Sequence, residues 1–209
     1  ISFYKVLHHN CRYKDCFIMV KSLQLPMQFD STLLHRDLEK IGDTEWIPHF
    51  NTRDYDGSWH VVALRGSAGA VHPVQAIYSD PTTTKFADTE LLSRCPYFKQ
   101  VLSRFQCPLK SVRLLNLQPG SIIKEHTDYN LGFEDGEVRI HVPVLTNQDV
   151  EFFLAGKRIM MQEGESWYLN VNLPHRVANR SSTDRVHLIL DCVVNDWMRT
   201  FFQESVPEN

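Results

Sequence analysis

From about residue 110 onward, apolar side chains recur at every second position, and this spacing limits the folds open to the chain. The clearest stretch is residues 137–145, which place Val138, Ile140, Val142 and Val144 on one face and Arg139, His141 and Pro143 on the other. Alternation with a period of two predicts a strand, because successive side chains of a strand point to opposite sides of the sheet.

Further short strands are expected at residues 150–154, 157–161 and 165–170, with Gly156 and Gly164 between them. Many short strands joined by regular turns are typical of a jelly roll. We therefore predict a mainly β fold, a double-stranded β-helix (jelly roll, cupin-like) with a few flanking helices.

The flanking helices are expected in the first half of the chain. Residues 30–42 combine a capping Asp30 or Ser31, an apolar stripe and a terminating Gly42, which predicts one helix. Residues 88–105 have helical apolar spacing that Pro96 divides in two. Between these helices, residues 65–84 are rich in small and turn-forming residues, and we expect a long loop over the mouth of a pocket.

Length and composition favour one domain, or one domain with an extension. The 209 residues, of which 43% are apolar, suit a domain over residues 27–209 preceded by an extension, residues 1–26, whose role is unknown. The chain begins with Ile1, so Met27 is a candidate start of the domain proper. Two histidines and two cysteines in the extension fit no standard zinc motif.

Charge and composition argue against nucleic acid as a partner, against a membrane span and against a disulfide framework. A net charge of -3 gives no electrostatic case for binding nucleic acid, for which a basic patch would be expected, and no apolar run reaches the roughly 20 residues of a membrane span. The five cysteines are odd in number and irregularly spaced, which favours free thiols in a reducing, cytoplasmic setting. Oligomeric state is open.

The chemistry-bearing pattern is His126-Thr-Asp128 together with the later His175. Side chains two residues apart on an extended segment point to the same side, and a distant imidazole could complete a three-ligand face on one metal ion. Two histidines and one carboxylate are the ligand set of non-haem Fe(II) oxygenases. The spacing alone is weak, since His-x-Asp often arises by chance.

Arg185 adds a second observation. It lies ten residues beyond His175 and opens the apolar run 185–194, which reads as a buried strand. A guanidinium is well suited to a carboxylate, because its planar fork makes two charge-assisted hydrogen bonds. In an oxygenase, this position would suit the far carboxylate of 2-oxoglutarate.

From about Trp46 to Trp197, three quarters of its length, the chain resembles the aspartyl/asparaginyl β-hydroxylase family of Fe(II)- and 2-oxoglutarate-dependent dioxygenases, and it is similar also to bacterial proline cis-hydroxylases. The matching pieces occur in order: Gly57-Ser58-Trp59, Leu117-Gln118-Pro119-Gly120, His126-Thr127-Asp128, Arg139-Ile140-His141, Pro174-His175-Arg176-Val177, Arg185 and residues 191–197.

The resemblance implies a hydroxylase, an oxidoreductase that uses Fe(II), 2-oxoglutarate and O2. It implies that His126, Asp128 and His175 bind the metal and form the catalytic centre, and that Arg185, Arg139, His141 and Trp59 contact 2-oxoglutarate. Some family members lack the carboxylate ligand and the proline-hydroxylating relatives have it, so Asp128 supports a complete triad.

Several alternatives stay open. Arg139 and His141 could be the solvent face of a half-buried strand, and Trp59 could be an ordinary core aromatic. His187 could be a partner of Arg185 or a packed core residue. A cupin-like metal enzyme without 2-oxoglutarate would have no need for Arg185, and a binding module could have kept the fold without catalysis. A free amino acid, a peptide-bound aspartyl or asparaginyl residue and a carrier-tethered amino acid all fit as substrate.

Overall fold

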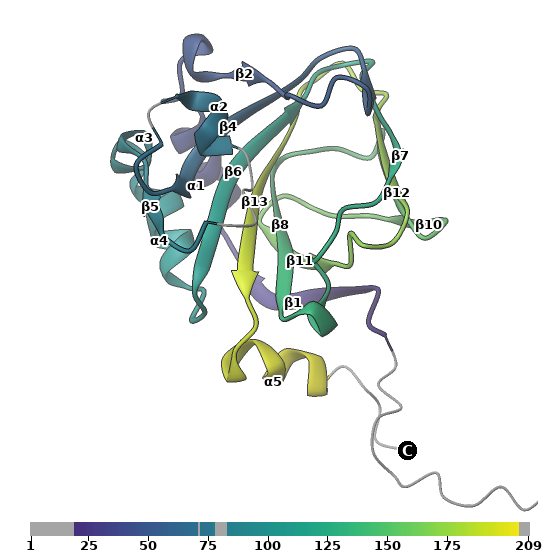
Figure 1. Ribbon diagram of the computed structural model, residues 1–209. Helices are drawn as coiled ribbons and strands as arrows, with labels where there is room; N and C mark the ends of the chain where they lie inside the picture. The colour runs from purple at the N-terminus through teal and green to yellow at the C-terminus, as the bar shows by residue number, and fades with distance from the viewer. Residues whose placement is uncertain (1–18, 71, 78–82, 205–209) are drawn as a thin grey trace, which may run out of the picture.

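The computed structural model describes residues 19–70, 72–77 and 83–204 and contains two antiparallel sheets that form a flattened barrel (Figure 1). The larger sheet has the order β1-β11-β8-β13-β6-β4-β2, with β5 paired to β4. Its strands are β1 (Ser22–Gln28), β11 (Glu165–Leu169), β8 (Glu137–Leu145), β13 (Arg185–Val193), β6 (Leu109–Leu117), β4 (Trp59–Ser67), β2 (Ile47–Pro48) and β5 (Phe86–Asp88).

The smaller sheet has the order β10-β9-β12-β7-β3. Its strands are β10 (Lys157–Ile159), β9 (Val150–Leu154), β12 (His175–Asn179), β7 (Ile122–His126) and β3 (Tyr55–Asp56). Two facing antiparallel sheets of short strands are the jelly-roll architecture, and the predicted fold class is confirmed.

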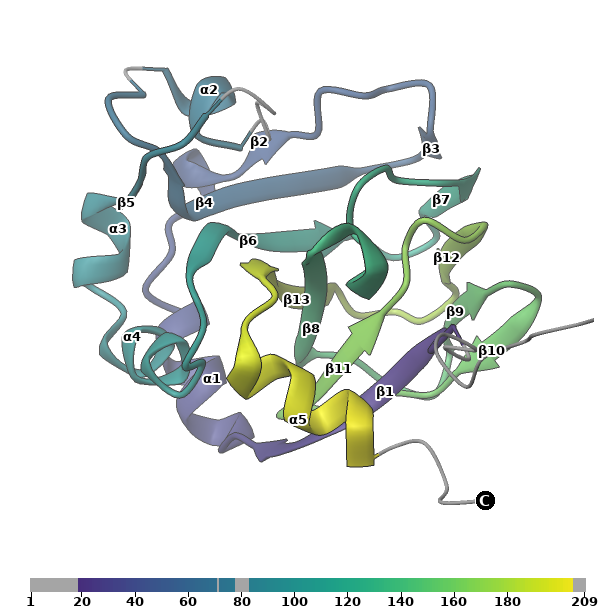
Figure 2. The same cartoon turned by 60° about the horizontal axis from the view of Figure 1, so that its bottom comes forward.

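Apart from the short helix at residues 73–77, which packs on β4 and accepts a hydrogen bond from the cavity residue Arg113, the helices lie outside the larger sheet, on the side away from β7 and β12 (Figures 1 and 2). They are α1 (Ser31–Leu38), α2 (Pro73–Ile77), α3 (Glu90–Ser93), α4 (Pro96–Ser103) and α5 (Asp196–Glu204), with single 3-10 turns η1 (Asp43–Glu45) and η2 (Phe133–Asp135). As predicted, Asp30 caps α1 by accepting from the Leu33 amide at 3.2 Å, and Pro96 separates α3 from α4 as the first residue of α4.

The alternation in β8 and β13 divides the interior into two parts. Val138, Ile140, Val142 and Val144 pack with Leu188 and Leu190 against the helices, in one core cluster with Leu34, Phe98 and Val101. The opposite face of the same strands, with Arg139, His141, Arg185, His187 and Asp191, points into the barrel. The strand prediction for residues 137–145 is therefore right, but the polar face of this strand is interior and does not face solvent.

The folded sheet includes residues that precede Met27, the candidate start of the domain. β1 spans this position, pairs with β11 and buries Leu25, so the folded sheet already includes residues from Ser22 onward. Residues 1–18 are not described, and the role of the extension stays a prediction. In the described ranges no helix is both long and apolar enough to span a membrane.

Candidate metal centre and its cavity

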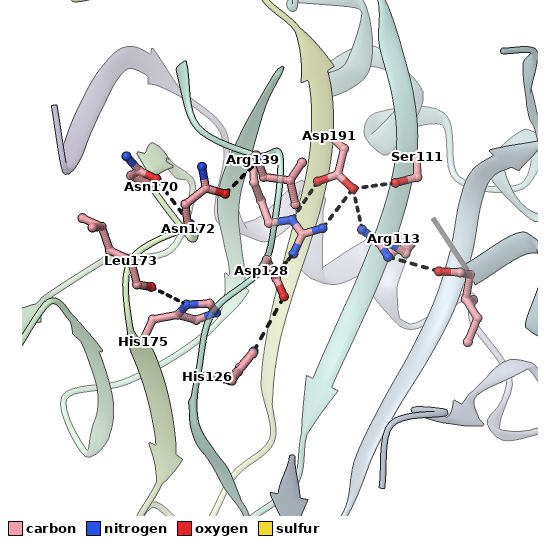
Figure 3. A network of polar contacts seen from close by, with 12 residues as sticks. Ser111, Arg113, His126, Asp128, Arg139, Asn170, Asn172, Leu173, His175 and Asp191 are labelled. Carbon is pink, nitrogen blue, oxygen red and sulfur yellow. Dashed lines mark hydrogen bonds and ion pairs between the residues drawn. The ribbon is translucent and has the colours of Figure 1, made fainter. Parts of the chain in front are cut away.

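Three potential metal ligands lie close together on neighbouring segments of the chain (Figure 3). His126 ends β7, Asp128 follows it by two residues, and His175 begins the neighbouring strand β12 directly opposite His126. One nitrogen or oxygen from each residue lies within 4.8 Å of the others. The three residues that the sequence analysis grouped are thus brought together.

Both imidazoles are oriented by their own backbone. Nδ1 of His126 donates to the Lys124 carbonyl at 2.7 Å, and Nδ1 of His175 donates to the Leu173 carbonyl at 3.0 Å. These bonds leave Nε2 of each ring as a free ligand atom, which is the usual arrangement of a metal-binding histidine. Burial and the neighbouring His126 lower the pKa of His175 to about 4, so its ring is neutral at pH 7.

Asp128 offers one carboxylate oxygen to the same centre. Its Oδ1 lies 3.9 Å from Nε2 of His126, while its Oδ2 accepts a hydrogen bond from Nη1 of Arg139. Burial alone would raise the pKa of Asp128, but Arg139 and the two histidines outweigh burial and lower it. The carboxyl group is therefore ionised at neutral pH, as a metal ligand requires.

The centre opens into a cavity of about 450 Å³. All seven residues that the sequence analysis assigned to the site line this cavity: His126, Asp128, His175, Arg139, His141, Arg185 and Trp59. These residues come from both sheets, so the fold and not sequence proximity brings them together.

Arg185 is a buried cation with an incomplete set of partners. Its side chain is 2% exposed, its Nη2 donates to Nδ1 of His187 at 2.9 Å, and its Nε has no partner. In the described part of the chain it forms no ion pair, and burial lowers its pKa to about 9, so it stays charged at pH 7. A buried, unpaired charge is costly, which favours an anionic ligand here.

His141 lies on the neighbouring strand β8, and both of its ring nitrogens are buried without a partner. Burial and the nearby Arg185 lower its pKa well below the usual range, so it is a neutral donor and acceptor. The contact with Arg185 identifies His187 as a partner of that guanidinium, which was one of the two alternatives.

Arg139 lines the cavity but is already engaged by two carboxylates. In addition to Asp128, it contacts Asp191 through Nε at 2.7 Å and Nη2 at 3.0 Å. Its guanidinium therefore has no nitrogen without a protein partner, in contrast to Arg185. Contact of Arg139 with 2-oxoglutarate stays a prediction, and the geometry favours a role in holding Asp128.

Trp59 is both a packed aromatic and a cavity wall. Its ring stacks on His49 with centroids 3.7 Å apart, and its Nε1 is buried without a partner. His49 lines the cavity as well, and burial followed by Arg113 lowers its pKa to about 4. His49 could not be identified from the sequence, because it has no companion at ligand spacing.

Arg113 is a second cavity residue that sequence reasoning missed. Its Nη2 donates to Asp191 at 2.6 Å and its Nη1 to the Ile77 carbonyl at 3.1 Å, while its Nε is buried without a partner. Among the residues that line the cavity, Phe50, Tyr129 and Asn130 are exposed and mark its mouth. None of the described residues of segment 65–84 lines it, so the loop expected over the mouth does not cover it there.

Comparison with known proteins gives a consistent result. The sequence model of the aspartyl/asparaginyl β-hydroxylase family matches residues 28–194. An L-proline cis-4-hydroxylase of Rhizobium meliloti (strain 1021) is 27% identical over 187 residues, which cover 88% of this chain but only 62% of that protein.

A solved structure of an oxidoreductase of the 2OG-Fe(II) oxygenase family from Burkholderia pseudomallei is similar in fold. It aligns with a TM-score of 0.51 at 14% identity, covering 83% of this chain and 85% of that one. At this identity the likeness concerns the fold alone.

Proposed function

The chain belongs to the aspartyl/asparaginyl β-hydroxylase family, and on that premise we propose that it is an Fe(II)- and 2-oxoglutarate-dependent dioxygenase. It hydroxylates an aliphatic carbon of an amino acid or of an aspartyl or asparaginyl residue, and it converts 2-oxoglutarate and O2 to succinate and CO2. The observation that carries this proposal is the unpaired, buried Arg185 in the same cavity as the His126, Asp128 and His175 cluster.

The donor set fits Fe(II). Two Nε2 atoms freed by backbone hydrogen bonds and one ionised carboxylate oxygen make the two-histidine, one-carboxylate set, and three ligands leave positions open for cosubstrate and O2. When bound, Fe(II) supplies the activation of O2 that drives oxidative decarboxylation of 2-oxoglutarate and hydroxylation of the substrate carbon.

The chain's own residues bind and orient the cosubstrate. Arg185 is the partner of the far carboxylate of 2-oxoglutarate, with His187 fixing the plane of its guanidinium from behind. His141, neutral and without a partner, is placed to donate to or accept from the same ligand. Apolar neighbours, among them Phe152 and Val177, limit access of water to this end of the cavity.

The substrate occupies the open end of the cavity, between the metal cluster and the mouth. Arg113 lines the cavity and has a buried Nε without a partner, although its Nη2 is paired with Asp191, and His49 and Trp59 form an aromatic wall. A carboxylate next to an aliphatic carbon, as in an amino acid or an aspartyl side chain, matches this combination of a cation and apolar surface. The family and the proline hydroxylase relative support an amino-acid-like or peptidyl substrate.

The alternatives explain less of the cavity. A cupin-like metal enzyme that does not use 2-oxoglutarate, or a binding module without catalysis, would leave the buried charge of Arg185 without a purpose. The cytoplasmic setting stays a prediction from cysteine usage, and Cys95, Cys107 and Cys192 are free thiols in the structure.

The proposal is tested by succinate formation. Purified protein is incubated under air with Fe(II), ascorbate and 2-oxoglutarate, across a panel of free amino acids and of peptides that contain Asp or Asn, with Asp128→Ala alongside. We expect succinate to rise with one class of panel member and to fall to the blank in Asp128→Ala. Bound iron at one equivalent with no succinate above the metal-free blank for any panel member would overturn the proposal.

A further inference from the structure

Asp191 lies behind the metal-binding carboxylate, one arginine away from it (Figure 3). It is 3% exposed, on the inner face of β13, and pairs in register with Arg139 of β8. Arg139 connects Asp191 to the metal-ligand cluster, because it contacts Asp191 on one side and Asp128 on the other. Asp191 has no place in the proposed binding of iron or 2-oxoglutarate.

The bond between Asp191 and Arg139 determines where the arginine points. Nε and Nη2 of Arg139 donate to the two oxygens of Asp191 at 2.7 and 3.0 Å, which is a bidentate pair. A bidentate pair fixes the plane of the guanidinium as well as its position. The remaining nitrogen, Nη1, is thereby directed at Oδ2 of Asp128.

Asp191 is itself held from the opposite side. Ser111 Oγ donates to its Oδ2 at 2.7 Å, and Arg113 Nη2 donates to the same oxygen at 2.6 Å. Ser111, Asp191 and Arg139 lie on β6, β13 and β8, which are adjacent strands in the middle of the larger sheet. Asp128, Asp191, Arg113 and Arg139 thus form one connected set of ion pairs.

Asp128 is the ligand that most needs such support. His126 and His175 are held by paired strands and by hydrogen bonds to their own backbone. Asp128 lies beyond the end of β7, where its amide donates to the Val171 carbonyl at 2.9 Å, and its side chain is 30% exposed. Its carboxylate is held in the protein by Arg139.

We propose that Asp191 is a positioning residue for the metal centre: through Arg139 it holds the Asp128 carboxylate so that Oδ2 stays on the arginine and Oδ1 faces the two histidines. Asp128 then binds metal through one oxygen in a fixed orientation. This inference rests on the proposed metal site. Groups behind a metal ligand typically change metal affinity by about 10- to 100-fold.

The test is a double-mutant cycle with Co(II), whose visible absorption reports its coordination. The metal-free unmodified protein, Asp191→Asn, Asp128→Ala and the double variant are each titrated with Co(II). We expect Asp191→Asn to weaken Co(II) binding roughly tenfold or more and to change the visible spectrum. In the Asp128→Ala background, Asp191→Asn should change the affinity less than about twofold, because the group through which it acts is gone.

Two outcomes would contradict different parts of this proposal. If Asp128→Ala leaves Co(II) affinity unchanged, the ligand assignment fails and the inference fails with it. If Asp128→Ala weakens binding but Asp191→Asn does not, or weakens it equally in both backgrounds, only the positioning role of Asp191 fails. Ser111→Ala, which keeps both charges and the bidentate pair, is the matched control and should change affinity less than Asp191→Asn.

Folding is checked by circular dichroism for each variant. Should Asp191→Asn not fold, Arg139→Lys takes its place in the cycle, since a lysine keeps the charge but cannot bridge two carboxylates as a planar fork. The same pattern is expected, with a loss of Co(II) affinity that disappears in the Asp128→Ala background. An equal loss in both backgrounds counts against the proposal.

Discussion

Arg185 donates a hydrogen bond to Nδ1 of His187 at 2.9 Å, and in the part of the chain that the structure describes no carboxylate forms an ion pair with it. Because Nδ1 accepts, the proton of neutral His187 resides on Nε2. The guanidinium is thus held from one side by a neutral ring. Its positive charge is not neutralised by that ring and remains available to an anionic ligand on the cavity side.

Arg185→Gln should therefore specifically weaken the binding of 2-oxoglutarate. Loss of a charge-assisted pair costs on the order of 2 kcal/mol, or about 30-fold in affinity. The dissociation constant of 2-oxoglutarate is measured by titration calorimetry in the presence of Mn(II). Arg180→Gln is the control, because Arg180 is exposed and pairs with Glu151 outside the cavity. Equal affinity in both variants would contradict the role of Arg185.

Replacement of either histidine ligand should abolish iron-dependent turnover. His126→Ala and His175→Ala each remove one of three ligands from the cluster, and we expect succinate formation at limiting Fe(II) to fall at least about 100-fold. His72→Ala, which changes an exposed histidine outside the cavity, should keep full activity. Full activity of either ligand variant at limiting iron would refute the ligand assignment.

The chain should depend on residues 22–26 for stability. A chain that starts at Met27 loses most of β1, the burial of Leu25 and the bond from the Asn170 amide to the Lys21 carbonyl. We expect its free energy of unfolding to be lower by about 2–5 kcal/mol, as for loss of a large buried side chain.

A chain that starts at Met19 keeps all of β1 and is the matched control. Urea unfolding followed by circular dichroism compares the two truncated chains with the full sequence. If the chain from Met27 is as stable as the chain from Met19, β1 contributes little to the fold.

Metal-free protein should lose stability as the pH falls below 6.5. The pKa of His49 is lowered to about 4 in the folded state, whereas an unfolded histidine titrates near pH 6.5. Between these values the unfolded chain binds more protons, so its free energy falls relative to the folded state as the pH decreases. The effect of this one group between pH 7 and pH 5 is about 1–2 kcal/mol.

The measurement is urea unfolding with a chelator at pH 7, 6 and 5. His49→Gln removes this titration while keeping a polar side chain, and we expect a smaller loss of stability toward pH 5 than in the unmodified protein. A loss of the same size in the variant would show that His49 is not responsible.

The sequence predicted the strands and the ligand cluster better than the surroundings of the cluster. Period-two alternation identifies a strand, but it cannot distinguish a polar face in water from a polar face inside a barrel, which is why Arg139 and His141 had two interpretations. His49 follows β2 and Arg113 lies on β6, and neither of these strands contains a ligand of the cluster. Only the pairing of strands brings them to the cavity.

The role proposed for Asp191 could not be predicted from the sequence. Asp191 lies within an apolar run and its motif was part of the family resemblance, yet the sequence assigned it no role. Its partners Arg139, Arg113 and Ser111 are between 52 and 80 residues away along the chain. A single sequence contains no local signal for such a cluster, since it depends on the register of three strands.

The candidate metal ligands are held in place by both sheets, and this has a mechanical consequence. Both histidines belong to the smaller sheet, whereas the arginine that holds Asp128 belongs to the larger one. An ion bound at this point would link the two sheets, because its ligands are anchored on both. Amide hydrogen exchange in β7 and β12 should then slow on metal binding, so the exchange rates of these two strands would report whether the metal site is occupied.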